Sequence, residues 1–233
     1  MWPLPLLGID GAAYRVAVSQ CVMATWRNSP ELTNTQRVLV REGLYAEIAP
    51  GRVVPADLAG EPSLRAQQLA PYIPRGHVAV TFSACWIYTG WWPPGRMREV
   101  FAAHPKRTKP PAMYRHAVPE AFSKRIGDLT VTTPARTAID LLLLEPLDQA
   151  MDGLFQLHGA HVTTAELLGQ VNLEYRRKRL PLVREIIGQF ADYIEWRDTV
   201  FEEAIRSLHA QAAGGDTGGA TGPPCDDHPS WNL

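Results

Sequence analysis

The sequence predicts an α+β protein in which a small N-terminal region precedes a mixed α/β domain. Three observations support this fold class. Helix-like segments precede two short β-prone runs near the N-terminus, short strands alternate with helices in the middle of the chain, and helical periodicity continues after Pro146. The 233 residues suffice for one large or two small domains, and hydrophobic residues make up 45% of them, as in ordinary globular proteins.

Hydropathy and cysteine content exclude several classes of protein. No apolar run reaches the roughly 18 residues of a membrane-spanning helix. Residues 1–8 are apolar, but they contain two prolines and no basic residue, unlike a signal peptide. The three cysteines, Cys21, Cys85 and Cys225, form no CxxC pair, which argues against zinc ribbons and redox motifs. We therefore expect a cytoplasmic protein with reduced cysteines and no membrane partner.

The first elements are predicted from helical spacing and turn residues. Residues 14–27 place small and apolar side chains three and four apart, which predicts a helix that ends before Pro30. A second helix is predicted over 33–43, with a Thr or Asn cap at its start and Gly43 at its end. Two β-prone runs around Pro50-Gly51 then predict a β-hairpin.

Two helices and a hairpin are the last elements of a winged helix-turn-helix, in which the later helix enters the DNA groove. On this interpretation Arg37 and Arg41, one turn apart, face DNA, and Arg52 lies on the wing. Many small domains also contain two helices and a hairpin, so the pattern alone does not decide the function.

Charge is unevenly distributed, although the formal net charge is −1. Residues 96–125 carry eight bases and two acids, and residues 192–227 carry eight acids and two bases. The basic middle is either a solvated surface or a second surface that follows a phosphate backbone. A possible second basic patch there would comprise Arg96, Arg98, Lys106, Arg107 and Lys109.

In the middle of the chain, short apolar runs bounded by Pro and Gly predict further elements. They are a short helix over 64–72, a buried strand over 77–82 that leads into a helix capped by Ser83, and strands over 98–102, 114–118 and 129–132. The aromatic residues of this part can stack on bases, but their setting is more typical of a core. These residues are Trp86, Tyr88, Trp91 and Trp92.

The clearest local signal lies at the end of the last predicted strand. Thr133 can cap a helix, and Pro134 occupies the first helical position. Arg136 and Asp140 are four residues apart and can pair along that helix, for about 0.2–0.5 kcal/mol.

After Pro146 the chain is predicted to be helical to residue 210. The sequence Thr163-Thr164-Ala165-Glu166 is a capping box, and an apolar stripe runs from Val183 to Leu208. The Gly-rich residues 211–233 cannot build a core and are predicted to be a disordered tail.

No catalytic residue, metal site or cofactor is predicted. His158 and His161 are close in sequence, but no Cys, Glu or third His completes a metal site. A Ser83–His116–Asp140 triad would lack the GxSxG elbow, and the glycine-rich phosphate-binding motifs are absent.

Three segments resemble AbiEi-type antitoxins of type IV toxin–antitoxin systems, in the form widespread in actinobacteria. They are GLYAEIAPG at 43–51, TFSACWIYTG at 81–90 and LTVTTPARTAIDL at 129–141. The resemblance spans roughly residues 16–201, and VTTPARTAIDL carries most of it.

The resemblance implies a winged helix over 1–58 that binds promoter DNA, followed by an antitoxin domain over 59–210. Family members repress their own operon and counteract a nucleotidyltransferase toxin, generally without a stable complex and without catalysis. This sequence departs from the family in two places. Too few helix-forming residues precede Val16, so the winged helix is truncated or the protein starts upstream. An acidic tail stands where some relatives carry an endonuclease-like domain, so nuclease activity is not expected.

We therefore expect an antitoxin-like transcriptional regulator that contacts phosphates through Arg37, Arg41 and Arg52. Such contacts position a protein on DNA without specifying a sequence. The alternative is a protein-binding module that has lost DNA binding through its truncated winged helix and uses the basic middle to meet an acidic partner. A third hypothesis, an enzyme acting on nucleic acid, would need clustered carboxylates.

Overall fold

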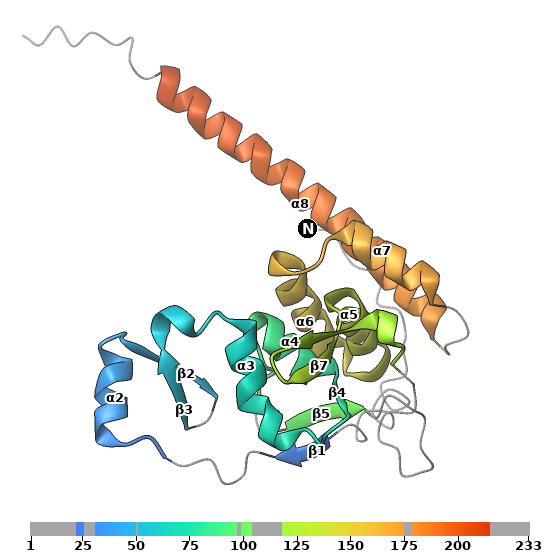
Figure 1. Cartoon of the computed structure of the whole chain (residues 1–233). Coiled ribbons are helices and arrows are strands. Elements are labelled where there is room, and N and C mark those ends of the chain that lie inside the picture. Colours follow the sequence, from blue (N-terminus) through green and yellow to red (C-terminus); the bar gives the residue numbers. More distant parts are fainter. Residues whose placement is uncertain are drawn as a thin grey trace, which may run out of the picture. The chain divides into compact units, whose positions relative to one another are not determined.

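The computed structural model describes residues 22–25, 31–49, 51–96, 99–103, 118–174 and 179–214 (Figure 1). The chain divides into two compact units between Gly188 and Gln189. The first unit contains all the described strands, every helix before α8 and the first turns of α8 (Leu180–Gly214), and the second unit contains the remainder of α8. The mixture of helices with small sheets agrees with the predicted α+β class.

The predicted second helix is present as α2 (Asn34–Arg41). The Thr33 hydroxyl accepts a hydrogen bond from the Gln36 N–H at 3.2 Å, and the Gln36 side chain accepts one from the Thr33 N–H at 2.9 Å. This reciprocal capping box satisfies two N–H groups that the helix cannot satisfy internally. After the helix, Gly43 adopts a left-handed φ of 72°, as its position in the sequence predicts.

The predicted hairpin is confirmed as β2 (Tyr45–Ala49) and β3 (Arg52–Pro55), which pair antiparallel. Gly51 turns the chain with a φ of 71°, which favours glycine. A short 3₁₀ helix, η1 (Ala56–Leu58), follows. Within the described residues, α2 and this hairpin therefore form a small substructure whose buried apolar side chains are Ala49 and Val54.

Within the described residues, five strands form one mixed sheet in the order β1-β5-β4-β7-β6. The strands are β1 (Val22–Thr25), β4 (Val78–Ala79), β5 (Glu99–Ala103), β6 (Ser123–Ile126) and β7 (Leu129–Thr132). β4 and β7 pair parallel, and the other neighbours pair antiparallel. The predicted strands over 98–102 and 129–132 are thus present as β5 and β7. Of the predicted strand over 114–118, residues 114–117 lie outside the described residues, and Val118 belongs to no strand.

Helices cover this sheet. They are α3 (Pro62–Leu69), η2 (Ala70–Tyr72), α4 (Thr81–Thr89), η3 (Glu120–Phe122), α5 (Pro134–Leu144), α6 (Leu147–Ala160) and α7 (Thr164–Leu173). α4 is buried on all sides from Thr81 to Tyr88, and α3, α5, α6 and β5 pack against it. Gly153 permits the close approach of α6, because a Cβ there would lie 2.9 Å from Leu141 Cδ1.

The prediction of a helix over residues 14–27 is wrong for residues 22–25. These residues form β1, which pairs with β5 with Val22 opposite Phe101, and residues 14–21 lie outside the described residues. The small and apolar side chains that suggested a helix also suit a strand, and pairing with β5 decides between the two. A segment of the predicted N-terminal region therefore belongs to the sheet of the α/β domain.

The predicted strand over 77–82 is only partly present. β4 contains only Val78 and Ala79, and α4 already begins at Thr81, with Val80 at the cap position. The expected cap, Ser83, lies inside the helix, where its Oγ accepts a hydrogen bond from the Phe101 N–H at 2.7 Å. Short apolar runs suit a buried strand and a buried helix equally, so periodicity could not separate them.

The C-terminal helical portion is present, with its predicted capping box at Thr163 and Glu166. α8 continues to Gly214, past the predicted start of the tail at 211, and residues 215–233 lie outside the described residues. In the described part of the chain, no helix is both long and apolar enough to cross a membrane.

The predicted cap of α5 provides a stability test. The Thr133 hydroxyl accepts a hydrogen bond from the Arg136 N–H at 3.4 Å. Thr133→Ala is expected to cost about 1 kcal/mol, because this N–H then loses its partner, and to lower Tm by about 2–4 °C. Thr133→Ser, which keeps the hydroxyl, is the control in thermal unfolding. If Thr133→Ala had the same Tm as wild type, the Thr133 hydroxyl would not stabilise the start of α5.

Candidate nucleic-acid interface

Helix α2 presents both of its arginines to solvent. The side chains of Arg37 and Arg41 are 59% and 74% exposed, and no residue of α2 is fully buried. The capping box fixes the start of the helix, and Gly43 turns the chain into the hairpin, so the two guanidinium groups lie one turn apart on a defined surface. Both arginines therefore lie on the predicted second helix and are exposed to solvent.

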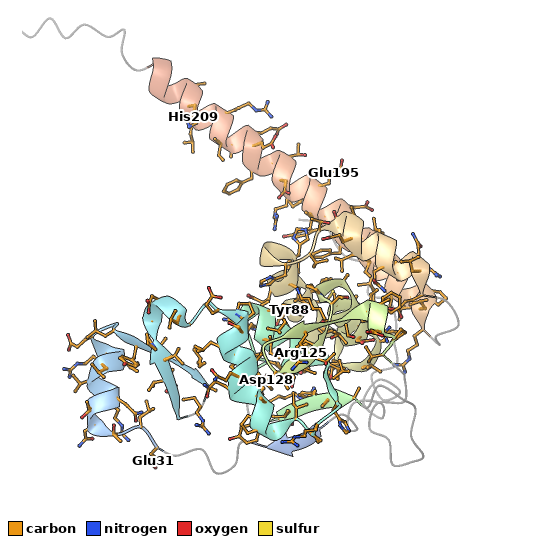
Figure 2. All side chains as sticks on the ribbon, in the orientation of Figure 1. Glu31, Tyr88, Arg125, Asp128, Glu195 and His209 are labelled. Atoms are coloured by element: carbon orange, nitrogen blue, oxygen red, sulfur yellow. The ribbon has the colours of Figure 1, made fainter. Side chains whose placement is uncertain are left out.

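Each of these arginines has an acidic neighbour. Arg37 Nη2 lies 3.7 Å from Glu31 Oε2, and Arg41 Nη2 lies 3.0 Å from Glu42 Oε1 (Glu31 is labelled in Figure 2). Exposed ion pairs contribute about 0–1 kcal/mol, so a phosphate that offers bidentate acceptance can replace them. The pairs position the guanidinium groups without burying them.

The hairpin contributes one further cation. Arg52 is exposed at the start of β3, directly after the turn. The turn itself is held by Glu47, whose carboxylate accepts a hydrogen bond from the Gly51 N–H at 2.8 Å. Residues 31–58 contain three bases and four acids, so phosphate contacts from this substructure would depend on Arg37, Arg41 and Arg52.

The possible second basic patch is contradicted at Arg96. Its side chain is only 13% exposed, and its Nε and Nη1 lie 2.7 Å from Glu99 Oε2 and Glu145 Oε2. The guanidinium also lies 5.1 Å from the ring centre of Phe82 and 4.7 Å from that of Phe101. Arg96 is therefore an internal ionic residue. The other members, Arg98, Lys106, Arg107 and Lys109, lie outside the described residues.

Glu145 is the buried partner of this cluster, at 2% exposure. Burial raises its pKa, because a carboxylate loses hydration, and the Arg96 guanidinium opposes that rise. Arg96 and Glu145 are 49 residues apart, so no local pattern in the sequence indicates the pair. Only the packing of the loop before β5 against the end of α5 brings them together.

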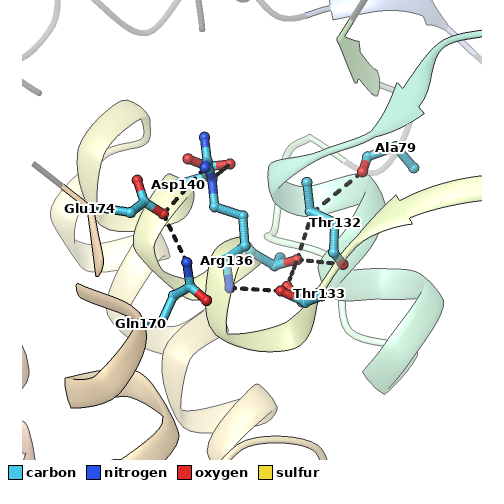
Figure 3. A network of polar contacts seen from close by, with 8 residues as sticks. Ala79, Thr132, Thr133, Arg136, Asp140, Gln170 and Glu174 are labelled. Atoms are coloured by element: carbon cyan, nitrogen blue, oxygen red, sulfur yellow. Dashed lines mark hydrogen bonds and ion pairs between the residues drawn. The ribbon is translucent and has the colours of Figure 1, made fainter. Parts of the chain in front are cut away.

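A second buried ionic cluster joins α5 to the end of α7 (Figure 3). Arg136 Nε lies 2.9 Å from Asp140 Oδ2, and Arg136 Nη1 lies 3.2 Å from Glu174 Oε1. The Gln170 amide donates to the same Glu174 oxygen at 3.3 Å. The sequence predicted the Arg136–Asp140 pair from its spacing, but not its burial or the participation of Glu174.

Hydroxyl groups tie the end of β7 to α4 and α5. Thr132 Oγ1 and Thr137 Oγ1 lie 2.7 Å apart, and the Tyr88 hydroxyl donates to the Thr132 carbonyl at 2.7 Å. Burial raises the pKa of Tyr88, so this phenol stays protonated and donates. In the segment 129–141, which carries most of the resemblance, the polar side chains of Thr132, Arg136, Thr137 and Asp140 therefore contact other buried groups of the protein.

Arg65 connects the segment that follows the hairpin to the end of α4 through backbone carbonyls. Its guanidinium donates to the carbonyls of Ile87 and Tyr88 at the end of α4, at 2.9 and 2.7 Å. It also donates to those of Ala59 and Gly60, directly after η1, at 2.7 and 2.9 Å. One side chain thus holds the segment that leaves the hairpin against α4.

The imagined triad does not assemble among the described residues. Ser83 and Asp140 are fully buried and engaged with Phe101 and Arg136, and His116 lies outside the described residues. Burial raises the pKa of the Cys85 thiol to about 12, which leaves it protonated at neutral pH. In the described ranges, no three His, Cys, Asp or Glu side chains gather in a group that could hold a metal ion.

Comparison with known proteins yields no match: no family model fits the chain, and neither a curated protein nor a solved structure is significantly similar to it.

Proposed function

We propose that the protein is a DNA-binding transcriptional regulator of the antitoxin type, which represses its own operon and counteracts a nucleotidyltransferase toxin. One observation carries the DNA-binding part. α2 is capped at both ends, is followed directly by a hairpin, and exposes Arg37 and Arg41 one turn apart. A helix of this kind can lie along a DNA groove while the guanidinium groups bind phosphates.

The antitoxin part rests on the resemblance of residues 43–51, 81–90 and 129–141 to that family. Those segments correspond to the first strand of the hairpin, to α4, and to β7 with the start of α5. Coexpression provides its test. The protein should restore growth to cells that express a nucleotidyltransferase encoded beside its gene, and continued growth arrest would contradict this part of the proposal.

DNA binding is tested with the DNA upstream of the coding sequence and a scrambled duplex, by fluorescence anisotropy across a salt series. We expect tighter binding to the upstream duplex. The double substitution Arg37→Ala/Arg41→Ala should weaken binding to both duplexes and lower the log–log salt slope by about 2, since each lost phosphate contact removes about 0.9.

Arg125→Ala is the matched control for this experiment. Arg125 is 75% exposed and lies 3.8 Å from Asp128, much as Arg37 pairs with Glu31, but it belongs to β6 (both residues are labelled in Figure 2). Its replacement should leave the affinity and the slope unchanged. If the double variant binds like wild type, α2 is not the recognition helix.

The second candidate function, a protein-binding module without DNA binding, has its own support. Residues 22–25 form a strand where the winged helix would need a helix, and residues 31–58 carry more acids than bases. Equal, weak binding of wild-type protein to both duplexes would favour this candidate over the regulator.

A further inference from the structure

The α2–hairpin substructure, residues 33–58, has a very small core. Its only buried apolar side chains are Ala49 and Val54, and α2 has no fully buried residue. α2, β2, β3 and η1 pack mainly against one another rather than against the helices and strands of the α/β domain. A segment of fewer than about 40 residues rarely buries enough surface to stay folded without a further constraint. The order of this substructure therefore depends on a contact with the rest of the protein.

Arg65, in α3, makes such a contact. Its side chain is charged and yet only 4% exposed. Its guanidinium donates to the carbonyls of Ala59 and Gly60, directly after the substructure, and to those of Ile87 and Tyr88 in the last turn of α4 (Tyr88 is labelled in Figure 2). The last carbonyls of a helix have no partner within the helix, and a cation is favourable there. The same guanidinium therefore satisfies the end of α4 and holds the chain that leaves the substructure.

Gly90 leaves the space that this guanidinium occupies. Gly90 ends α4 with a left-handed φ of 75°, and a Cβ there would lie 3.2 Å from Arg65 Nη1. Gly76 has a similar φ of 77°, but a Cβ there would meet no atom within 4 Å. An added methyl group would thus strain the backbone at both glycines and press on the guanidinium only at Gly90.

We propose that Arg65 is a positioning residue that keeps the α2–hairpin substructure ordered against α4. A planar guanidinium can donate to carbonyls on two segments at once, whereas the ammonium of a lysine is a single point of charge. The consequence for DNA binding rests on the proposed function. An ordered substructure presents Arg37 and Arg41 in place, and a disordered one would have to be ordered during binding, which lowers the affinity.

Hydrogen exchange of the full chain, measured by mass spectrometry, tests this proposal without DNA. Arg65→Lys should speed the exchange of the protected amides in residues 34–55 at least about tenfold and that of α5 less than about twofold. Arg75→Lys makes the same change at an exposed arginine and should leave both rates as in wild type. No faster exchange in residues 34–55, or an equal increase in α5, would overturn the proposal.

The two glycines give a second test that keeps Arg65 itself. Gly90→Ala and Gly76→Ala place the same strain on a left-handed residue, but only Gly90→Ala displaces the guanidinium. Exchange in residues 34–55 should be at least about threefold faster in Gly90→Ala than in Gly76→Ala. Equal rates in the two variants would also overturn the proposal.

DNA binding supplies a readout that a loss of global stability would not move. Arg65→Lys should weaken binding to the upstream duplex at least about threefold while the log–log salt slope stays at the wild-type value, because Arg65 contacts no phosphate. The slope of Arg37→Ala/Arg41→Ala falls instead. Wild-type affinity in Arg65→Lys would overturn the positioning role. If the wild-type protein itself binds no DNA, the proposed function fails, and the exchange rates still decide whether Arg65 orders the substructure.

Discussion

Replacing Arg96 by leucine is expected to destabilise the protein by about 3–5 kcal/mol, because it leaves the Glu145 carboxylate buried without its ion-pair partner. The same change removes the cation that lies against the rings of Phe82 and Phe101. Thermal unfolding should show a fall in Tm of about 10 °C. Arg41→Leu breaks an exposed ion pair and should cost less than about 1 kcal/mol.

The loss of stability caused by Arg96→Leu should depend on pH. The pKa of Glu145 is already raised by burial, and without Arg96 it rises further. A folded-state pKa above the unfolded value gives stability that is present at low pH and disappears as the pH rises through the folded pKa. In denaturant unfolding, the free energy of unfolding of Arg96→Leu should therefore differ little from that of wild type near pH 5, and the difference should be largest near pH 8. An equal difference at both pH values would contradict the role of Glu145.

The second large effect is expected for Arg136→Met. Arg136 is shared by two buried carboxylates, Asp140 and Glu174, at 2.9 and 3.2 Å, so its removal takes one ion-pair partner from each of them. We expect a loss of about 3–5 kcal/mol in the free energy of unfolding. An exposed pair at the same spacing would lose only about 0.2–0.5 kcal/mol.

Urea unfolding at low and high salt distinguishes these two cases. The contribution of a buried cluster persists at 1 M salt, because solvent ions do not screen it, whereas that of an exposed pair is reduced. Arg125→Met is the control, since Arg125 pairs with Asp128 at the surface. A loss of less than 1 kcal/mol for Arg136→Met would mean that the cluster contributes no more than a surface pair.

Local elements were predictable where one short stretch of sequence contains all the interacting groups. The capping boxes at Thr33 and Thr163, the cap at Thr133 and the left-handed Gly43 are of this kind. Each depends on hydrogen bonds or sterics within about four residues, which the sequence displays directly.

Elements whose identity depends on a distant partner were predicted less well. Residues 22–25 carry small apolar side chains that suit either helix or strand, and pairing with β5 made them a strand. Residues 81–82 read as strand but form the start of α4, because this short apolar run is buried among α3, α5 and α6 rather than in the sheet.

The sequence by itself determined the α+β class, the hairpin, the helix caps at Thr33, Thr133 and Thr163, and the Arg136–Asp140 spacing, because these depend on residue type and short-range geometry. Only the tertiary structure decided that Arg96 is internal, that Glu145 pairs with Arg96, and that Glu174 pairs with Arg136. Arg136 and Glu174 are 38 positions apart, and Arg96 and Glu145 are 49 positions apart. The packing of helices and loops brings the members of each pair together and buries them. A count of charges along the chain cannot distinguish a cation in water from one enclosed by carboxylates and aromatic rings.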